Sequence, residues 1–333
     1  MFISFFRTSH YLNLLVLPLV LLVMWVFILP KTEIINTENA FPLFLSMLRY
    51  LASMRVLTIC ISLILIVLQA FYLTVVINRH SVLKENSHLP ALLYVVLMSC
   101  FPEQLTFNPL LFTNFFIILF LNSLFHFYRI DSAVFQVFDA GLYIGIASLF
   151  YWPAMFLFPL IWAALIVLRP FSLREWIASV AGLLLPIMAF AVILYWFDLM
   201  SLASIEAILQ PFYRVQFSAV YNNTYFILFG ILALIGIASL VSFSRELGTF
   251  AKLRTRKYLA LMIWFFLFAA LSYLVSVKKS MVSLSFMAIP FSVLTSNYFL
   301  SLRNRIIAEV IFLILLAAVI YNQVLYFLTF YPV

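Results

Sequence analysis

The sequence predicts an all-α polytopic membrane protein, a single helical bundle that crosses a lipid bilayer about eleven times. Two observations carry this prediction. Of the 333 residues, 67% are hydrophobic and only 9% are charged, whereas a soluble domain is roughly half apolar and about a quarter charged. The apolar residues also come in runs of about twenty, the length that an α-helix needs to cross the hydrocarbon core of a bilayer.

Eleven apolar runs are expected to be the membrane spans. They lie near residues 11–30, 56–78, 89–106, 109–129, 132–150, 152–169, 176–197, 224–244, 257–277, 281–300 and 306–329. The first run has no small-residue cleavage pattern behind it, so we interpret it as an uncleaved span rather than a signal peptide. We therefore expect residues 1–333 to form a single transmembrane domain.

The basic residues predict the orientation of the bundle. With the N-terminus in the cytoplasm and the C-terminus outside, most of the 19 Lys and Arg residues fall in cytoplasmic loops, as the positive-inside rule requires. This distribution also accounts for the net charge of +8. The charge is spread between apolar runs rather than gathered on one polar face, so nucleic acid is not expected as a partner.

Four further segments carry local signals. Residues 31–55 and 198–223 on the exterior side are amphipathic and resemble helices that lie in the membrane interface. In the fifth span, Gly141 and Gly145 of GLYIG form a small-xxx-small face that predicts close packing of two helices. The basic loop at 244–258 is interpreted as a topological anchor near anionic lipid headgroups.

The exterior face holds the candidate site residues. Glu33 and Glu38 lie in the first exterior loop, and Glu103 lies in SCFPEQLTFNP, the turn between the third and fourth spans. Exterior bases could bind a phosphate or diphosphate headgroup, Arg through paired hydrogen bonds and Lys as a point charge. These bases are Arg49, Arg55, Arg214, Lys278 and Lys279. The alternative interpretation is that all of these residues are ordinary solvated loop charges.

Other kinds of site are not predicted. The four histidines are scattered without the spacing of a zinc site, and no metal ligands are assigned. The sequence has no glycine-rich phosphate loop, nucleophile elbow or CxxC pair. Glu85 and Glu175 stand beside cytoplasmic bases and are expected to form exposed surface ion pairs.

The arrangement of exterior acids resembles the GT-C class of polytopic glycosyltransferases over about residues 1–200. In that class a first exterior loop carries an acid and interfacial helices, and a second acid follows between spans three and four. Here Glu33 or Glu38 matches the first acid, 42–55 the interfacial helix and Glu103 the second acid. Residues 201–333 are then additional C-terminal spans. The chain as a whole also resembles uncharacterised inner-membrane proteins of Bacteroidetes, which implies a bacterial inner membrane.

The resemblance implies transfer of a sugar from a polyprenyl-phosphate donor at the exterior membrane face. Glu33 or Glu38 is the expected general base with Glu103 assisting, and Arg49, Arg214 and Lys278 are expected near the phosphate. A divalent cation that orients the acceptor hydroxyl is an alternative to direct base catalysis, and no other cofactor is implied. Two other readings stay open: a non-catalytic subunit or scaffold that binds membrane-protein partners in an envelope assembly, and a transporter or lipid flippase.

Overall fold

The computed structural model describes residues 2–7, 11–25, 40, 44–45, 54–128, 130, 132–197, 225–247, 253–275 and 281–330. Within these ranges the protein is all-helical, as predicted, and has no β-strand. Six helical segments of this part of the chain are long and apolar enough to cross a membrane. They are Val56–Arg79, Leu173–Trp196, Tyr225–Arg245, Leu253–Val275, Met281–Ser301 and Arg305–Leu328.

These six segments belong to named helices whose limits differ from them by a few residues. The helices are α4 (Arg55–Arg79), α9 (Leu173–Trp196), α11 (Tyr225–Leu247), α12 (Leu253–Val275), the pair η4 (Met281–Leu284) and α13 (Ser285–Ser301), and α14 (Arg305–Phe330). The other predicted spans correspond to shorter apolar helices. These are η1 (Tyr11–Val16) with α2 (Leu17–Trp25), α5 (Leu89–Met98), α6 (Pro109–Phe125), α7 (Val134–Phe150), and η3 (Trp152–Leu157) with α8 (Pro159–Leu168).

The span expected at 89–106 is broken near its end, and the break positions the candidate site. The Ser99 hydroxyl donates to the carbonyl oxygen of Val95 at 2.9 Å, a bond that competes with the helical ladder. Pro102 has no N–H with which to continue that ladder. The chain therefore leaves the α-helix after Met98 and forms a short 3-10 turn, η2 (Pro102–Leu105). This turn carries Glu103 at the end of the bundle.

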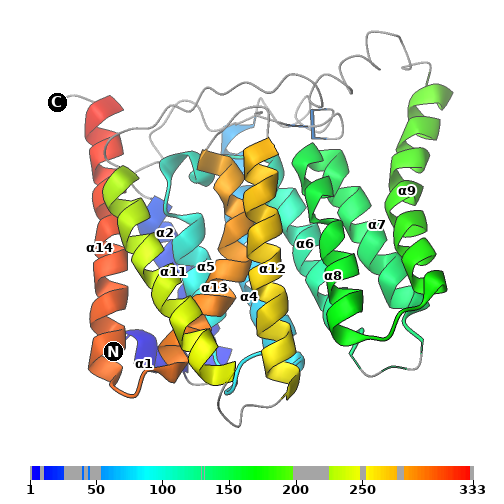
Figure 1. Cartoon of the computed structure of the whole chain (residues 1–333). Coiled ribbons are helices and arrows are strands. Elements are labelled where there is room, and N and C mark those ends of the chain that lie inside the picture. Colours follow the sequence, from blue (N-terminus) through cyan, green and yellow to red (C-terminus); the bar gives the residue numbers. More distant parts are fainter. Residues whose placement is uncertain are drawn as a thin grey trace.

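The helices run roughly parallel to one axis and alternate in direction (Figure 1). A short N-terminal helix, α1 (Phe2–Arg7), packs beside the start of α14. There Ser4 donates to Glu309 at 3.1 Å, and Arg7 donates to the Leu300 carbonyl at 3.3 Å. We call this end of the bundle the Arg7 end. At the opposite end, the Glu103 end, α5 finishes and α11 begins.

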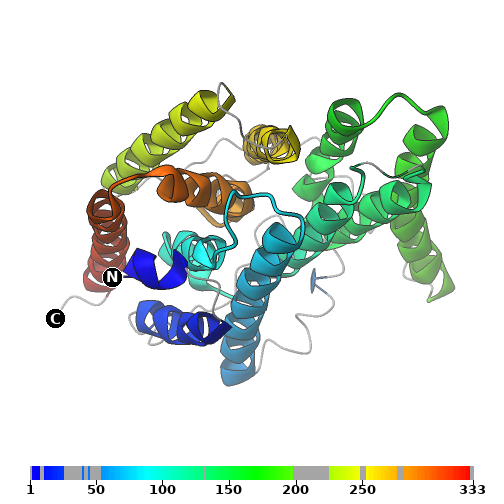
Figure 2. The same ribbon diagram turned by 90° about the horizontal axis from the view of Figure 1, so that it is seen from below.

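Helix α5 is the centre of the bundle. All ten of its residues are buried, and a view along the bundle places it among α1, α2, α4 and α13 (Figure 2). Hydrogen bonds made by side chains tie neighbouring helices together. Tyr94 of α5 donates to Gln69 of α4 at 2.6 Å, and Asn114 of α6 donates to the Ser285 carbonyl of α13 at 3.4 Å.

The predicted close packing at Gly141 and Gly145 is confirmed. Both glycines of α7 face α9, the helix on the far side of the molecule from α14 (Figure 1). A Cβ atom at Gly145 would lie 2.5 Å from Cγ of Pro186 and 2.6 Å from the carbonyl oxygen of Leu183. Real Cβ atoms do not approach that closely, so the interface between α7 and α9 requires glycine at this position.

The prediction of an exposed surface ion pair is wrong for Glu175. Its carboxylate contacts Arg169 at 3.0 Å, and both side chains are less than a tenth exposed. The same carboxylate oxygen accepts the Ala133 backbone N–H at 3.0 Å, and Arg169 donates to the Ile130 carbonyl at 2.8 Å. The pair is buried because it satisfies backbone groups of the turn between α6 and α7, which sequence neighbours alone did not indicate. Glu85 does form an exposed pair, with Arg7 at 3.6 Å.

Candidate functional site

Glu103 is the candidate site residue whose side chain the structure describes. Arg55 is the first residue of α4, and its side chain lies outside the described part. The remaining candidates also lie outside the described residues: Glu33, Glu38, Arg49, Arg214, Lys278 and Lys279. The candidate site is therefore built here from Glu103 and from the described residues around it.

The turn that carries Glu103 is held by its own polar residues. The Thr106 hydroxyl donates to the Glu103 carbonyl at 2.7 Å. The Asn108 amide donates to the carbonyls of Thr106 and Gln104 at 2.8 and 3.2 Å, and its Oδ1 accepts the Leu111 N–H at 3.2 Å. Asn108 is thus the N-cap of α6 and ties that helix to the turn before it. The backbone of Glu103 is fixed on both sides.

The two carboxylate oxygens of Glu103 have different environments. Oε1 accepts the hydroxyl of Tyr225, the first residue of α11, at 2.6 Å. The Tyr225 ring packs edge to face on Phe101, with the centroids 5.4 Å apart, which holds α11 against the turn. Oε2 is buried and has no hydrogen-bond partner among the described residues. One oxygen therefore orients the carboxylate, and the other is available to accept a hydrogen bond from a bound hydroxyl or water.

Three buried amides surround the end of α5. Gln323 and Asn322 of α14 donate to the carbonyls of Ser99 and Cys100 at 2.8 and 2.9 Å. Gln104 donates to the Met281 carbonyl at 3.3 Å. In each case the amide nitrogen is used, and the amide oxygen has no donor among the described residues. Together with Oε2 of Glu103, they make this end of the molecule rich in buried acceptor atoms.

The first long loop reaches the same end of the bundle. Ala40 forms an isolated antiparallel bridge with Tyr151, the residue between α7 and η3. The buried ring of Phe44 packs on Phe107 at 5.5 Å and on Phe112 at 6.2 Å between centroids. Phe107 follows Glu103 by four residues. The structure thus brings described residues of the first loop to the turn that carries Glu103.

An apolar cavity of about 390 Å³ adjoins this turn. Its walls come from α5, α11, α12 and α13, and it includes Phe101 and Gln104 on either side of Glu103 in the sequence. Phe229 and Phe291 also line it. A hydrocarbon chain is the kind of ligand that such a lining accepts, because the cavity walls are almost entirely apolar.

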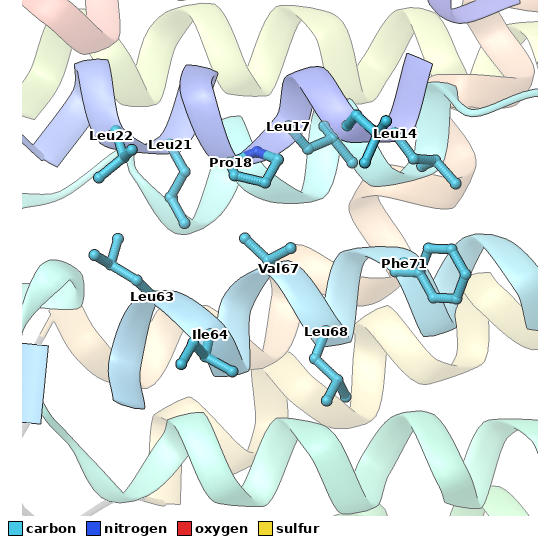
Figure 3. A pocket seen from close by; sticks show the side chains of 11 residues that line it. Leu14, Leu17, Pro18, Leu21, Leu22, Leu63, Ile64, Val67, Leu68 and Phe71 are labelled. Carbon is cyan, nitrogen blue, oxygen red and sulfur yellow. The ribbon is translucent and has the colours of Figure 1, made fainter. Parts of the chain in front are cut away.

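A second apolar groove lies between α2 and α4 and has a volume of about 710 Å³. Pro18 and Leu21 of α2 face Val67 of α4 across it (Figure 3). Every side chain that lines it is a hydrocarbon, so the groove offers no group that would fix a polar ligand in one orientation. It is suited to lipid chains in general.

The described residues offer little for a divalent cation. Among them, no group of three or more His, Cys, Asp and Glu side chains is arranged to hold a metal ion. Glu103 supplies one carboxylate, and the oxygens nearest to it in the sequence and across α14 are neutral amides. Sites for Ca²⁺ and Mg²⁺ are built from several oxygen ligands that include carboxylates. The described residues thus do not amount to such a site.

Sequence reasoning found Glu103 but missed its partners. Tyr225, Asn322 and Gln323 were not among the predicted site residues. The signal that was available is the Asn–Gln pair inside an apolar helix, because buried amides must find partners. The sequence does not show that the partners of these amides are the backbone carbonyls of Ser99 and Cys100, which lie more than two hundred residues away.

A protein-family model matches residues 39–331 of the chain, and its description is a family of unknown function, DUF6427. No curated protein and no solved structure matches the chain. The match covers the candidate residues Glu103, Arg49 and Arg214 but begins just after Glu38.

Proposed function

Because the chain belongs to the family of unknown function DUF6427, we propose its function from its own geometry: a membrane-embedded glycosyltransferase-like protein that uses a polyprenyl-phosphate-linked sugar. The observation that carries the proposal is the carboxylate of Glu103. One of its oxygens is fixed by Tyr225, and the other is buried without a described partner. An apolar cavity lies beside it. A lipid-linked sugar needs both features, a polar group for the sugar and an apolar space for the chain.

The proposal includes a topology. All eleven apolar segments cross a bacterial inner membrane, with the Arg7 end in the cytoplasm and the Glu103 end outside. The alternating helix directions support this, as does the position of α1 and the last turn of α14 at opposite ends of the bundle (Figure 1). The described basic residues at the Arg7 end support it through the positive-inside rule. They include Arg7, Arg79, Lys84, Arg169, Arg174, Arg245, Arg254, Arg256, Lys257, Arg303 and Arg305.

The proposed chemistry is a single group transfer. The acceptor hydroxyl loses its proton to a carboxylate as its oxygen forms a bond to the anomeric carbon of the sugar. The bond between that carbon and the phosphate oxygen breaks, and polyprenyl phosphate leaves with the electron pair. Glu103 accepts a hydrogen bond from the hydroxyl through Oε2 and assists a base from the first loop, Glu33 or Glu38. Arg49, Arg214 and Lys278 stabilise the charge that grows on the phosphate.

Sequence proximity supports the grouping of these residues. Glu38 precedes Ala40 by two residues, and Ala40 pairs with Tyr151 at the Glu103 end. Lys279 precedes Met281 by two residues, and the Met281 carbonyl accepts a hydrogen bond from Gln104. The described residues that lie nearest to Glu38 and Lys279 in the sequence, Ala40 and Met281, are thus at the Glu103 end of the bundle.

The direct test is sugar transfer by the purified full chain in lipid vesicles. Polyprenyl-phosphate donors with radiolabelled hexoses are supplied, and label that leaves the donor is measured. Glu103→Gln keeps the shape of the side chain but removes its charge and its basicity, and we expect transfer to fall by about a hundredfold or more. Glu85→Gln is the matched control, because Glu85 is an exposed carboxylate at the Arg7 end.

Two results would contradict the proposal. One is full transfer by Glu103→Gln, Glu33→Gln and Glu38→Gln, each measured alone. The other is the absence of transfer from every polyprenyl donor by a folded wild-type protein. Either result would turn the search to a scaffold of an envelope assembly, tested by co-purification of membrane partners, or to lipid transport.

A further inference from the structure

A second polar site lies at the Arg7 end, where α4 and α6 finish and α12 begins. We call it the His–Arg cluster and define it as His80, His126, Tyr128, Arg254 and Lys257. The imidazole rings of His80 and His126 meet edge to face, with their centroids 4.5 Å apart. The Arg254 guanidinium lies 5.7 Å from the ring centroid of Tyr128, and the Lys257 ammonium lies 6.0 Å from it. Three helix ends that are distant in the sequence thus bring two histidines, a tyrosine and two cations together in one place.

Hydrogen bonds define which ring nitrogens carry protons. Nδ1 of His126 lies 2.7 Å from the backbone carbonyl oxygen of Asn122, and a carbonyl only accepts, so Nδ1 is the donor. Nε2 of His80 lies 3.0 Å from Oδ1 of Asn122 and donates to it. Nε2 of His126 has no hydrogen-bond partner among the described residues. When protonated, it is a donor that faces no competing acceptor from this part of the chain.

The positive charge of the cluster is not neutralised by the described acids. No described carboxylate forms an ion pair with Arg254 or Lys257. Nε of Arg254 donates to the Tyr258 hydroxyl at 3.3 Å, which leaves the two Nη groups without a partner among the described residues. A guanidinium that presents both Nη groups is suited to paired hydrogen bonds with a carboxylate or a phosphate.

The pKa of His80 reflects its burial and the positive charge of its neighbours. Burial lowers the pKa of His80 to about 4, and the charges of His126, Arg254 and Arg79 act in the same direction, against the hydrogen bond to Asn122. The described charged side chains that act on His80 in this way, His126, Arg254 and Arg79, are all basic. Cations that disfavour one another in this way gain stability when an anion binds among them.

The cluster is held rigidly, as a binding site requires. The Tyr258 hydroxyl donates to the Phe125 carbonyl at 2.8 Å, which joins α12 to the end of α6. The turn that carries Tyr128 is fixed by Arg169, which donates to the Ile130 carbonyl and pairs with Glu175. His80 and Tyr258 form a buried floor, whereas the Arg254 and Lys257 side chains are only half-buried.

The outer face of α12 indicates what kind of anion reaches the cluster. Trp264 lies seven residues, about two helical turns, beyond Lys257 and begins an apolar stripe that continues at three- and four-residue steps through Leu267, Leu271 and Leu274. These four apolar side chains are 43–57% exposed. Residues at such spacing share one face of a helix, and an exposed apolar face of this length on a membrane helix is covered by lipid. The cations thus lie at the head of a lipid-covered surface.

We propose that the His–Arg cluster binds the phosphate of an anionic lipid whose chains lie along the exposed stripe of α12. The Nη groups of Arg254 bind two phosphate oxygens, and Lys257 contributes a point charge. The site is independent of the chemistry proposed at the Glu103 end.

The test is lipid binding by the full chain in detergent, measured by native mass spectrometry. Phosphatidylglycerol, phosphatidic acid and phosphatidylcholine of equal chain length are titrated, with inorganic phosphate in a separate arm. We expect the two anionic lipids to bind more tightly than phosphatidylcholine. The double variant Arg254→Gln/Lys257→Gln should weaken their binding about tenfold, equal to about 1.4 kcal/mol. The single variant Lys257→Gln should weaken lipid binding less than the double variant. Because it keeps the contact between Arg254 and Tyr258, any loss of binding that it shows is not due to a folding defect at that contact.

The matched control is Arg303→Gln/Arg305→Gln, which removes two exposed charges from the same end of the bundle. We expect this pair to leave lipid binding within about twofold of the wild type, because the charges lie outside the cluster. Equal weakening by both double variants would overturn the proposal and indicate general attraction to negative charge. The assignment to a lipid would be overturned by two results together. The protein would bind inorganic phosphate without displacement of lipid, and it would bind all three lipids with equal affinity.

Discussion

Four buried side-chain oxygens at the Glu103 end, on Glu103, Gln104, Asn322 and Gln323, have no donor among the described residues. A buried acceptor that is left unpaired costs about 1–3 kcal/mol. The protein accepts this cost at a position where three helices and a turn meet, and water or a ligand with hydroxyl groups would remove it. At the residue scale, this set of acceptors and the cations of the His–Arg cluster are the chemically distinctive features of the described bundle.

His80 gives a pH-dependent prediction at the same scale. Its pKa is lowered from 6.5 to about 4 in the folded protein, chiefly by burial. The unfolded chain therefore binds the proton more tightly, and the contribution of neutral His80 to stability is complete above about pH 6.5 and is lost as the pH falls toward 4. The expected loss at pH 5 is about 2 kcal/mol.

The measurement is the melting temperature of the protein in detergent at pH 7.5 and pH 5. His80→Gln lacks the titrating group, so its melting temperature should fall less than that of the wild type over this interval. Other groups titrate in both proteins and lower both melting temperatures. The difference between the decrease in the wild type and the decrease in His80→Gln is therefore the contribution of His80. An identical fall in the two proteins would show that His80 takes up its proton freely in the folded state.

At the element scale, the strongest packing requirement is the contact between α7 and α9. Gly145→Ala would place a Cβ atom against Pro186 and the Leu183 backbone, so we expect it to lower the free energy of unfolding by about 1–3 kcal/mol. Gly230→Ala in α11 is the control, because a Cβ atom there meets nothing within 4 Å. That variant should be neutral or slightly stabilising, since alanine favours the helix.

Thermal unfolding in one detergent decides between these expectations. A drop in melting temperature for Gly145→Ala alone would support the packing seen between α7 and α9. Equal effects of the two substitutions would mean that helix propensity, rather than the approach of the two backbones, controls stability.

The positions of most helices were predictable from the sequence. The residues at which an expected span is interrupted were harder to predict. Run length and apolar composition located most of the described helices to within a few residues, because a membrane span must be long and apolar. The short helix α1 was not predicted. The early end of α5 was missed, although Pro102 stood inside the expected span 89–106. Pro153 and Pro159 likewise divide the span expected at 152–169 into η3 and α8. The expected interfacial helices at 31–55 and 198–223 lie almost wholly outside the described residues.

The packing of the helices was much harder to predict than their positions. Apolar spans share one composition, so most of them carry no mark of their neighbours, and the Gly141–Gly145 face was the exception. Glu103 could be found because an acid between two prolines is unusual in an apolar chain. Its contact with Tyr225 spans more than a hundred residues and depends on which helix lies beside the turn. No local pattern records that choice.

At the scale of the whole molecule, the topology gives a further prediction. If all eleven apolar segments cross the membrane, the two ends of the bundle face different compartments. Single cysteines at the exposed residues Ser81, near the Arg7 end, and Phe197, near the Glu103 end, should then react with an impermeant thiol reagent from opposite sides. The native Cys60 and Cys100 are first replaced by serine.

The assay is carried out in intact cells and in lysed cells. We expect a cysteine at Phe197 to react in intact cells and a cysteine at Ser81 to react only after lysis, because an odd number of expected spans separates the two positions. A reporter fused to the C-terminus, following α14, gives an independent reading that does not depend on side-chain access. Reaction of both cysteines from the same side would contradict the odd number of crossings.

The enclosure of α5 has a consequence for how the protein is made. A helix of ten residues rises about 15 Å, half of the roughly 30 Å hydrocarbon core. Both of its ends, at His88 and Ser99, are buried among other segments. When α5 leaves the ribosome, the helices α13 and α14 that later enclose it have not been synthesised. If α5 crosses the membrane as proposed, the translocon must retain it, or pass it into the bilayer together with α4 and α6, until the C-terminal third of the chain arrives to complete its surroundings.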